Sequence, residues 1–256
     1  MKIVVCMKQT PSGDSALRIN AAENWIDLSD VDFETNEPDS YALEEALRLK
    51  DEHSAEVIVI TAGTSNETKA IKEALAKGAD RGILVEDDSL GGGADPRTTA
   101  TALAAAIGRE SPDLVLTGLQ SDDAGFGQTG VVVAEQLGLP HATLIVELKT
   151  DGSSLDLKRE LEAGWFQQLE LPLPALLTIQ SGINKPRYAT LMGIKRARKK
   201  PLQRLTLADL DISVTPDVQL RRIYAPAKQK TGSLLTGTPA EQATQLLTKL
   251  REEKLI

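Results

Sequence analysis

A glycine-rich segment at residues 118–130 has the composition of an anion-binding loop. It reads GLQSDDAGFGQTG and lies between an apolar run at residues 113–117 and the helical pattern VVVAEQLG. A glycine-rich turn that leaves a parallel strand and begins a helix directs backbone N–H groups outward, which suits a phosphate. The segment lacks the ending of a Walker A motif and the GxGxxG spacing, so phosphoryl transfer is not indicated. A nucleotide site and an aspartate-rich surface loop both fit this pattern.

A second glycine cluster, Gly91-Gly92-Gly93-Ala94-Asp95, also precedes a helical pattern. Three consecutive glycines lose much conformational entropy when they are ordered. The cluster also follows a long polar stretch, EDDSL. We therefore favour a surface connection here over a second phosphate loop.

No group of residues has the pattern of a catalytic or metal centre. His53 and His141 lie far apart in the chain, and neither has a cysteine or carboxylate at ligand spacing, so no metal site is predicted. No Ser, Cys or Lys nucleophile has a visible base partner. Cys6 falls in the apolar run at the N-terminus, where a buried and inert thiol is expected. We expect no catalytic residues.

The segment at residues 184–200 combines apolar residues with a compact run of cations. Leu191 lies between turn-prone residues in NKPRYATLMG, and five of the six residues in KRARKK, 195–200, are Lys or Arg. A solvated patch, a nuclear-type signal and an electrostatic docking surface for an acidic protein are all compatible with this run. An apolar side chain beside cations is typical of an interface anchor.

The elements that position these residues form an α/β pattern. Short β-branched runs alternate with helical stretches, and strands are predicted over residues 2–7, 56–61, 82–85 and 113–117. Asp95 and Pro96 supply an N-cap and a first-turn proline for one helix, and residues 42–50 form another. Continuous apolar strands predict a largely parallel sheet with helices on both faces.

The second half of the chain adds antiparallel or mixed strands to this sheet. The runs ATLIVELK, SLDLKREL, FQQLELPL and PALLTI follow one another closely, with Asp151-Gly152 and Ala163-Gly164 as tight turns. Residues 201–237 show no sustained period. Thr238 and Glu241 then form a capping box before a helix whose stripe contains Ala243, Leu246, Leu247 and Leu250. This extended C-terminal arm is predicted to lie on a partner, or alternatively to close the chain's own sheet.

Composition limits the class of protein. The 256 residues suit one large domain or one domain with an appendage, and a net charge of −8 argues against general nucleic-acid affinity. Aromatic residues make up 3%, too few for base-stacking platforms. No apolar stretch reaches the roughly 18 residues of a membrane span, the N-terminus does not resemble a signal peptide, and the single cysteine agrees with a reducing compartment. We expect an intracellular protein without direct membrane insertion.

At these motifs the chain resembles the β subunits of the electron transfer flavoprotein (ETF/FixA) family, of the type that serves trimethylamine dehydrogenase and acyl-CoA dehydrogenases. KRELEAG followed by LPALLTI resembles the family signature, and INKPRYATL followed by GIKRARKK resembles its recognition loop. The similarity extends to IVVCMKQ, NEPDSYALEEALRLK, ALAKGADRGI and GLQSDDAGFGQTG. The chain departs from the family at Ala163, where many members have glycine.

The resemblance implies a Rossmann-like nucleotide-binding domain over residues 1–225, with the recognition loop at 184–200. It implies an arm and helix over residues 226–256 that pack on an α subunit. Such a subunit binds a structural AMP, while the redox FAD lies mainly in the α subunit, at the interface. It performs no bond-making chemistry and passes electrons from a flavoprotein dehydrogenase to ETF-quinone oxidoreductase.

The resemblance also assigns site residues by position. Backbone amides of the glycine-rich loop and the Thr129 hydroxyl face the phosphate, while Cys6, Ala62 and Gln120 lie nearer the adenosine. Leu191 is the docking anchor, accompanied by Tyr188, Lys195 and Arg196. The implied AMP contacts are Cys6, Asn36, Glu37, Pro38, Asp39, Ala62, Gly118, Leu119, Gln120, Ser121, Asp122, Asp123, Gly127, Gln128 and Thr129.

Two alternatives remain open at this point. A bifurcating subunit of the same family carries a second FAD in place of AMP. A stand-alone AMP- or ATP-binding enzyme or sensor built on the same sheet would need no partner. The location is the bacterial cytoplasm or the mitochondrial matrix, and no nucleic-acid partner is expected.

Overall fold

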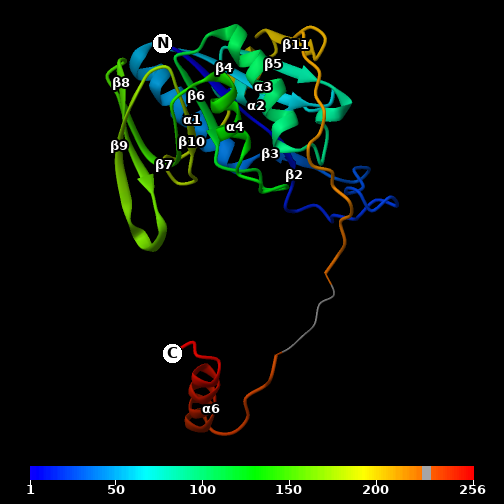
Figure 1. Ribbon diagram of the computed structural model, residues 1–256, viewed down its shortest axis with the longest axis vertical. Helices are drawn as coiled ribbons and strands as arrows, with labels where there is room; N and C mark the ends of the chain where they lie inside the picture. Colours follow the sequence, from blue (N-terminus) through cyan, green and yellow to red (C-terminus); the bar gives the residue numbers. More distant parts are fainter. Residues whose placement is uncertain (227–231) are drawn as a thin grey trace. The chain divides into compact units, whose positions relative to one another are not determined.

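A nine-stranded sheet is the centre of the larger of two units into which the chain divides. The computed structural model describes residues 1–226 and 232–256, and the compact units are Met1–Ile223 and Tyr224–Ile256. Strands β11 and β9 lie at the two edges of the sheet (Figure 1). In sheet order the strands are β11 (Leu202–Thr206), β5 (Arg81–Glu86), β4 (Glu56–Gly63), β1 (Lys2–Cys6), β6 (Leu114–Gly118), β10 (Ala175–Ile179), β7 (His141–Thr150), β8 (Ser154–Glu160) and β9 (Phe166–Pro172).

The sheet has a parallel part and an antiparallel part. All neighbours from β11 to β7 pair in parallel, whereas β7, β8 and β9 form consecutive antiparallel hairpins. The four strands predicted in the first half are present, and the four strand-like runs of the second half form β7 to β10. The predicted fold class, a largely parallel α/β sheet with added antiparallel strands, is therefore confirmed.

Helices cover both faces of the parallel strands, as the continuous apolar runs predict. Helices α1 (Glu37–His53) and α2 (Lys69–Lys77) pack on one face. Helices α3 (Pro96–Glu110) and α4 (Thr129–Leu137) pack on the other. The predicted start of α3 is confirmed, because the Asp95 carboxylate accepts hydrogen bonds from the N–H groups of Arg97 and Thr98.

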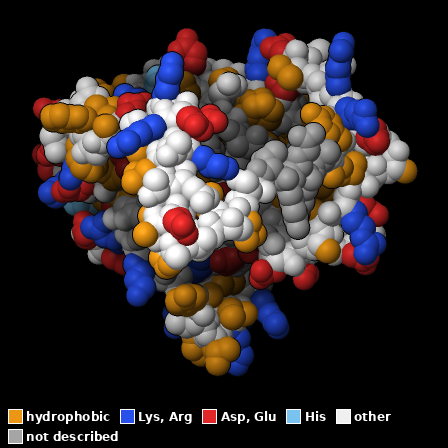
Figure 2. Space-filling view, turned by 90° about the horizontal axis from the view of Figure 1, so that it is seen from below, with side chains coloured by type: hydrophobic (Ala, Val, Ile, Leu, Met, Phe, Trp, Pro, Cys, Tyr) orange, Lys and Arg blue, Asp and Glu red, His pale blue; other side chains and the backbone are white. Residues whose placement is uncertain are grey.

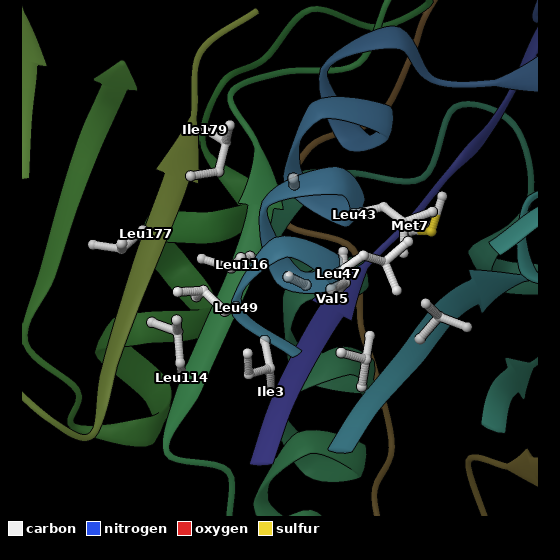
Figure 3. Close-up of a cluster of buried hydrophobic side chains, with 14 of the residues drawn as sticks. Ile3, Val5, Met7, Leu43, Leu47, Leu49, Leu114, Leu116, Leu177 and Ile179 are labelled. Carbon is white, nitrogen blue, oxygen red and sulfur yellow. The ribbon is translucent and has the colours of Figure 1, made fainter. Parts of the chain in front are cut away.

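The core between the sheet and α1 follows from the two periodicities of strand and helix. In β1, Ile3 and Val5 face α1, whereas Val4 and Cys6 belong to the core on the other face. Leu43 and Leu47, one helical turn apart, reach the side of the sheet formed by Ile3 and Val5 (Figure 3). Burial of each such leucine stabilises the fold by about 1.5–3 kcal/mol, so this layer fixes α1 over β1.

Both predicted tight turns are present in the antiparallel part. Gly152 has a φ of 93°, and the Asp151 carboxylate accepts a hydrogen bond from the Ser153 N–H at 2.8 Å. At the second turn, Ala163 has a φ of 57° in the left-handed region. That conformation costs an L-residue roughly 1–2 kcal/mol, and Ala163 adopts it in this turn all the same.

Several elements were not predicted from the sequence. Residues 201–237 contain β11, and the N-terminal region contains a small antiparallel pair, β2 (Gln9–Pro11) and β3 (Phe33–Thr35). The segment at residues 184–200, which we expected to be a loop, contains a short helix, α5 (Leu191–Ala197). Two single-turn 3₁₀ helices, η1 (Asp88–Leu90) and η2 (Glu162–Gly164), complete the unit.

The smaller unit, Tyr224–Ile256, contains helix α6 (Pro239–Glu252). The predicted capping box is confirmed: the Glu241 N–H donates to the Thr238 hydroxyl, and the Thr238 N–H donates to the Glu241 carboxylate. No residue of α6 is buried, and Leu246 and Leu247 are 48% and 47% exposed. Residues 227–231 of the predicted arm lie outside the described residues.

Candidate functional site

A cavity of about 380 Å³ lies at the carboxyl ends of β1, β4 and β6. The chain leaves β1 through α1 on one face of the sheet and leaves β6 through α4 on the opposite face. Adjacent parallel strands whose connections diverge in this way leave a crevice between them, which is where open α/β sheets bind ligands. The volume is within the range of small-molecule sites.

Most of the residues implied as nucleotide contacts come together in this cavity. Cys6, Ala62 and Gly118 stand at or after the ends of β1, β4 and β6. The others that line it are Asn36, Asp39, Leu119, Gln120, Ser121, Asp123, Gly127, Gln128 and Thr129.

Three of the implied contacts do not line the cavity: Glu37, Pro38 and Asp122. Pro38 is buried at the start of α1. The Glu37 N–H donates a hydrogen bond to the Asp122 carboxylate at 3.0 Å. The bond between Glu37 and Asp122 therefore attaches the glycine-rich loop to the start of α1.

Asn36 holds the glycine-rich loop against the beginning of α1. Its side-chain amide donates to the Gln120 carbonyl at 2.9 Å and accepts from the Asp122 N–H at 2.9 Å. Both polar groups of this buried side chain are thus satisfied by the loop backbone. Gly127 has a φ of 63°, a conformation that glycine adopts without strain. The loop is therefore held in one conformation.

The N-terminus of α4 borders the cavity through Gln128, Thr129 and Gly130. In the described chain, Gln128 forms no side-chain cap hydrogen bond with the first turn. A Cβ atom on Gly130 would lie 2.7 Å from the Thr117 hydroxyl and 2.9 Å from the Thr178 methyl group. Only glycine therefore lets the helix begin this close to the ends of β6 and β10. The first N–H groups of a helix have no partner within it and carry a partial positive charge, so they border the cavity here.

Charged groups also line the cavity, and the prediction omitted two of them, Lys8 and Glu67. The Lys8 ammonium group pairs with the Asp123 carboxylate at 2.6 Å. Burial opposes ionisation of Asp123, but Lys8 and further hydrogen bonds lower its pKa overall. Burial raises the pKa of Glu67. The position of Lys8, two residues after the end of β1, was the available signal.

Asp39 ties the ends of two neighbouring strands together. Its carboxylate accepts hydrogen bonds from the Lys8 N–H at 2.7 Å and from the Gly118 N–H at 3.0 Å. Burial raises the pKa of Asp39 to about 7, although these hydrogen bonds lower it in part. A Cβ atom on Gly118 would overlap this carboxylate. Cys6 is buried beside it, and burial raises the pKa of its thiol, as expected for an inert cysteine.

Another part of the lining comes from residues that the sequence did not indicate. The second glycine cluster is an exposed connection, as predicted, but Gly91, Gly92 and Gly93 also line the cavity. Apolar side chains join them: Trp25, Leu28, Phe33, Leu90 and Leu103. The cavity thus combines the backbone of the glycine-rich loop with both charged and apolar side chains from other parts of the chain.

The predicted docking residues lie on the surface, outside the cavity. Leu191 is the first residue of α5, and the Thr190 hydroxyl caps this helix by accepting from the Gly193 N–H at 3.0 Å. Leu191 and Tyr188 are 86% and 90% exposed, and Lys195 and Arg196 are also exposed.

The ends of this segment are attached to the domain. Arg187 forms ion pairs with Glu44 and Asp51, both at 3.0 Å. The Lys200 ammonium group donates to the Leu75 carbonyl at 2.9 Å. An apolar tip with firmly attached ends is pre-organised for binding, because few of its groups must be ordered on association.

Among the residues that the structure describes, no group of three His, Cys, Asp or Glu side chains is arranged to hold a metal ion. No described helix is both long and apolar enough to cross a membrane. On the face shown in Figure 2, Lys and Arg side chains are interspersed with Asp and Glu side chains.

Comparison with known proteins gives consistent results. Residues 24–210 match the family described as "Electron transfer flavoprotein domain". The β subunit of electron transfer flavoprotein from Methylophilus methylotrophus is 37% identical over 265 residues, which cover 99% of both chains. The mitochondrial β subunit from Arabidopsis thaliana is 34% identical over 99% of this chain and 98% of its own. The caffeyl-CoA reductase-Etf complex subunit CarD from Acetobacterium woodii is 34% identical over the full length of both.

Proposed function

The chain belongs to the electron transfer flavoprotein family, and we propose that it is the AMP-binding β subunit of a heterodimeric electron carrier. It is similar to β subunits of electron transfer flavoproteins over nearly the whole length of both chains. A role in electron transfer follows from the family. Binding of AMP by this subunit, the redox partners and the docking surface are the parts that we propose.

The AMP proposal rests on the cavity at the carboxyl ends of β1 and β6, where the chain leaves these two strands toward opposite faces of the sheet. It combines a glycine-rich loop with a helix N-terminus that lacks a side-chain cap in the described chain. Such a terminus is a ready site for an anion, since several N–H groups and the helix dipole point to it. We place the phosphate of AMP at Thr129 and Gly130, and the nucleoside nearer Cys6, Ala62 and Gln120.

The charges of the cavity suit a single phosphate. Of the Lys and Arg side chains in the described residues, only Lys8 lines the cavity, and it is already paired with Asp123. Backbone N–H groups therefore provide most of the anion binding. Asp39 does not oppose it strongly, because a pKa raised to about 7 leaves this carboxyl partly protonated near neutral pH.

The redox chemistry of the complex belongs to FAD, which this proposal assigns mainly to the α subunit, at the interface. When bound, the flavin accepts and donates the electrons. This chain supplies no nucleophile or metal in the proposal, so it acts as a carrier subunit and not as an enzyme. Its contribution is to bind AMP, complete the interface and present the docking segment.

Two surfaces support the proposed partners. No residue on the apolar stripe of α6 is buried by the described residues, and an amphipathic helix with such an uncovered face suits an obligate contact with the α subunit. Leu191 and the cations of α5 suit transient contact with a flavoprotein dehydrogenase, such as trimethylamine or acyl-CoA dehydrogenase. ETF-quinone oxidoreductase is the proposed acceptor, and the bacterial cytoplasm is the proposed location.

A glycine substitution tests the phosphate position. We expect Gly130→Ala to displace the first turn of α4, because its Cβ would lie 2.7 Å from the Thr117 hydroxyl. Each lost hydrogen bond to a charged group is worth about 1.5–3 kcal/mol, so AMP affinity should fall roughly ten-fold or more. Calorimetric titration of the purified heterodimer with AMP measures the change.

The matched control is Gly108→Ala in α3. A Cβ atom there would meet only the Leu137 side chain, at an ordinary 3.7 Å. This variant should bind AMP like the wild type, and FAD content should be the same in all three proteins. Unchanged AMP affinity in Gly130→Ala would contradict the proposed phosphate position.

A further inference from the structure

Residues 19–26 form a short hairpin at the cavity. Ile19 and Ile26 pair as an isolated antiparallel bridge. Within the hairpin, the Asn20 N–H donates to the Trp25 carbonyl at 2.8 Å, and the Asn20 side chain accepts from the Asn24 N–H at 3.2 Å. The hairpin therefore has a defined conformation, and Trp25 lies at a defined place in it.

The end of the larger unit holds this hairpin in position. Glu23, at the hairpin turn, pairs with Arg222 at 2.6 Å, and its carbonyl accepts from the Ile223 N–H at 2.8 Å. The same chain segment is attached to α3 by an ion pair between Asp217 and Arg97. Both contacts of Glu23 restrict the movement of the hairpin, which an exposed loop of this length without such contacts would retain.

The Trp25 indole packs on the second glycine cluster and lines the cavity. A Cβ atom on Gly92 would overlap the indole, and one on Gly93 would lie 3.6 Å from it. The absence of a side chain at Gly92 is therefore what lets the ring lie against the loop backbone, and Gly93 leaves room for an ordinary contact. The packing of Trp25 therefore accounts for glycine in this cluster without a phosphate bound there.

We propose that Trp25 forms the base-binding wall of the nucleotide site and stacks on the adenine ring. This inference rests on the proposed AMP function and adds a stacking surface for the base to the nucleoside position proposed near Cys6, Ala62 and Gln120. The phosphate needs N–H donors, which the loop and α4 provide, whereas a base needs a flat apolar surface. Trp25 is the largest flat side chain of the lining, and Leu28 and Phe33 also contribute apolar surface to the cavity.

The test compares a ligand with a base and a ligand without one. The nucleotide-free heterodimer is titrated by calorimetry with AMP and, separately, with ribose 5-phosphate, for the wild type, Trp25→Leu and Trp25→Phe. A stacked base loses roughly ten-fold or more in affinity when its aromatic partner is removed. We expect that loss for AMP in Trp25→Leu, no loss for ribose 5-phosphate, and recovery of most of the AMP affinity in Trp25→Phe.

The outcomes separate this inference from the function on which it rests. Equal losses for both ligands would show that Trp25 only supports the fold, and unchanged AMP affinity in Trp25→Leu would show that it does not touch the base. Either result overturns the inference while AMP binding by the wild type still stands. A wild-type heterodimer that binds no AMP would contradict the proposed function itself, and the inference with it.

Discussion

Replacing Leu246 and Leu247 together with glutamate is expected to abolish association with the α subunit. Both side chains lie on the apolar stripe of α6 and are about half exposed. In an interface, each new carboxylate would be buried without a partner, which costs several kcal/mol per charge. Two such charges should weaken the heterodimer roughly a thousand-fold or more.

The measurement is co-purification of the variant with its α subunit, followed by size-exclusion chromatography. The control, Gln245→Glu with Thr248→Glu, adds the same charge on the opposite side of the same helix. It should yield an intact heterodimer with its flavin. If the leucine variant also yields an intact heterodimer, α6 does not form the subunit contact. That result would favour the alternative in which the arm closes the chain's own sheet.

Leu191→Ala is expected to slow electron transfer from the dehydrogenase by about ten-fold or more at sub-saturating concentrations. Leu191 is 86% exposed at the beginning of α5, so the fold does not depend on its side chain. As an interface anchor it would contribute affinity, whereas Lys195 and Arg196 would contribute to the association rate. FAD and AMP contents should therefore remain unchanged.

Stopped-flow reduction of the heterodimer by the reduced dehydrogenase measures this rate. Leu17→Ala is the matched control, because Leu17 is also exposed, at 54%, but lies outside the docking segment. Higher ionic strength should slow transfer to the wild type and should do so less for a Lys195→Ala, Arg196→Ala variant. Wild-type kinetics in Leu191→Ala would refute the anchor assignment.

The sheet could be predicted because its strands carry strong and independent patterns. The four β-branched runs of the first half form β1, β4, β5 and β6, and the Asp151-Gly152 turn joins β7 to β8. Strand β11 was missed because only Leu205 of its residues is buried, so an edge strand shows little apolar alternation. Helix α5 was missed because it is short and contains Gly193, which usually opposes a helix.

The glycine-rich wall of the cavity could be predicted, since a glycine-rich loop after a parallel strand is a local pattern. The rest of the lining depends on contacts between distant parts of the chain, such as Trp25 with Gly92 and Glu23 with Arg222. No local period encodes such contacts. The low aromatic content argued against a stacking platform, yet one tryptophan that the fold places in the cavity is sufficient to form a wall.

If this chain binds AMP and completes a single flavin site, the heterodimer holds one AMP and one FAD. The purified heterodimer is denatured, and the released nucleotides are separated and identified by mass spectrometry. We expect AMP and FAD in equimolar amounts, with AMP lost selectively from Gly130→Ala. Release of FAD without AMP from the wild type would contradict the claim and support the bifurcating alternative.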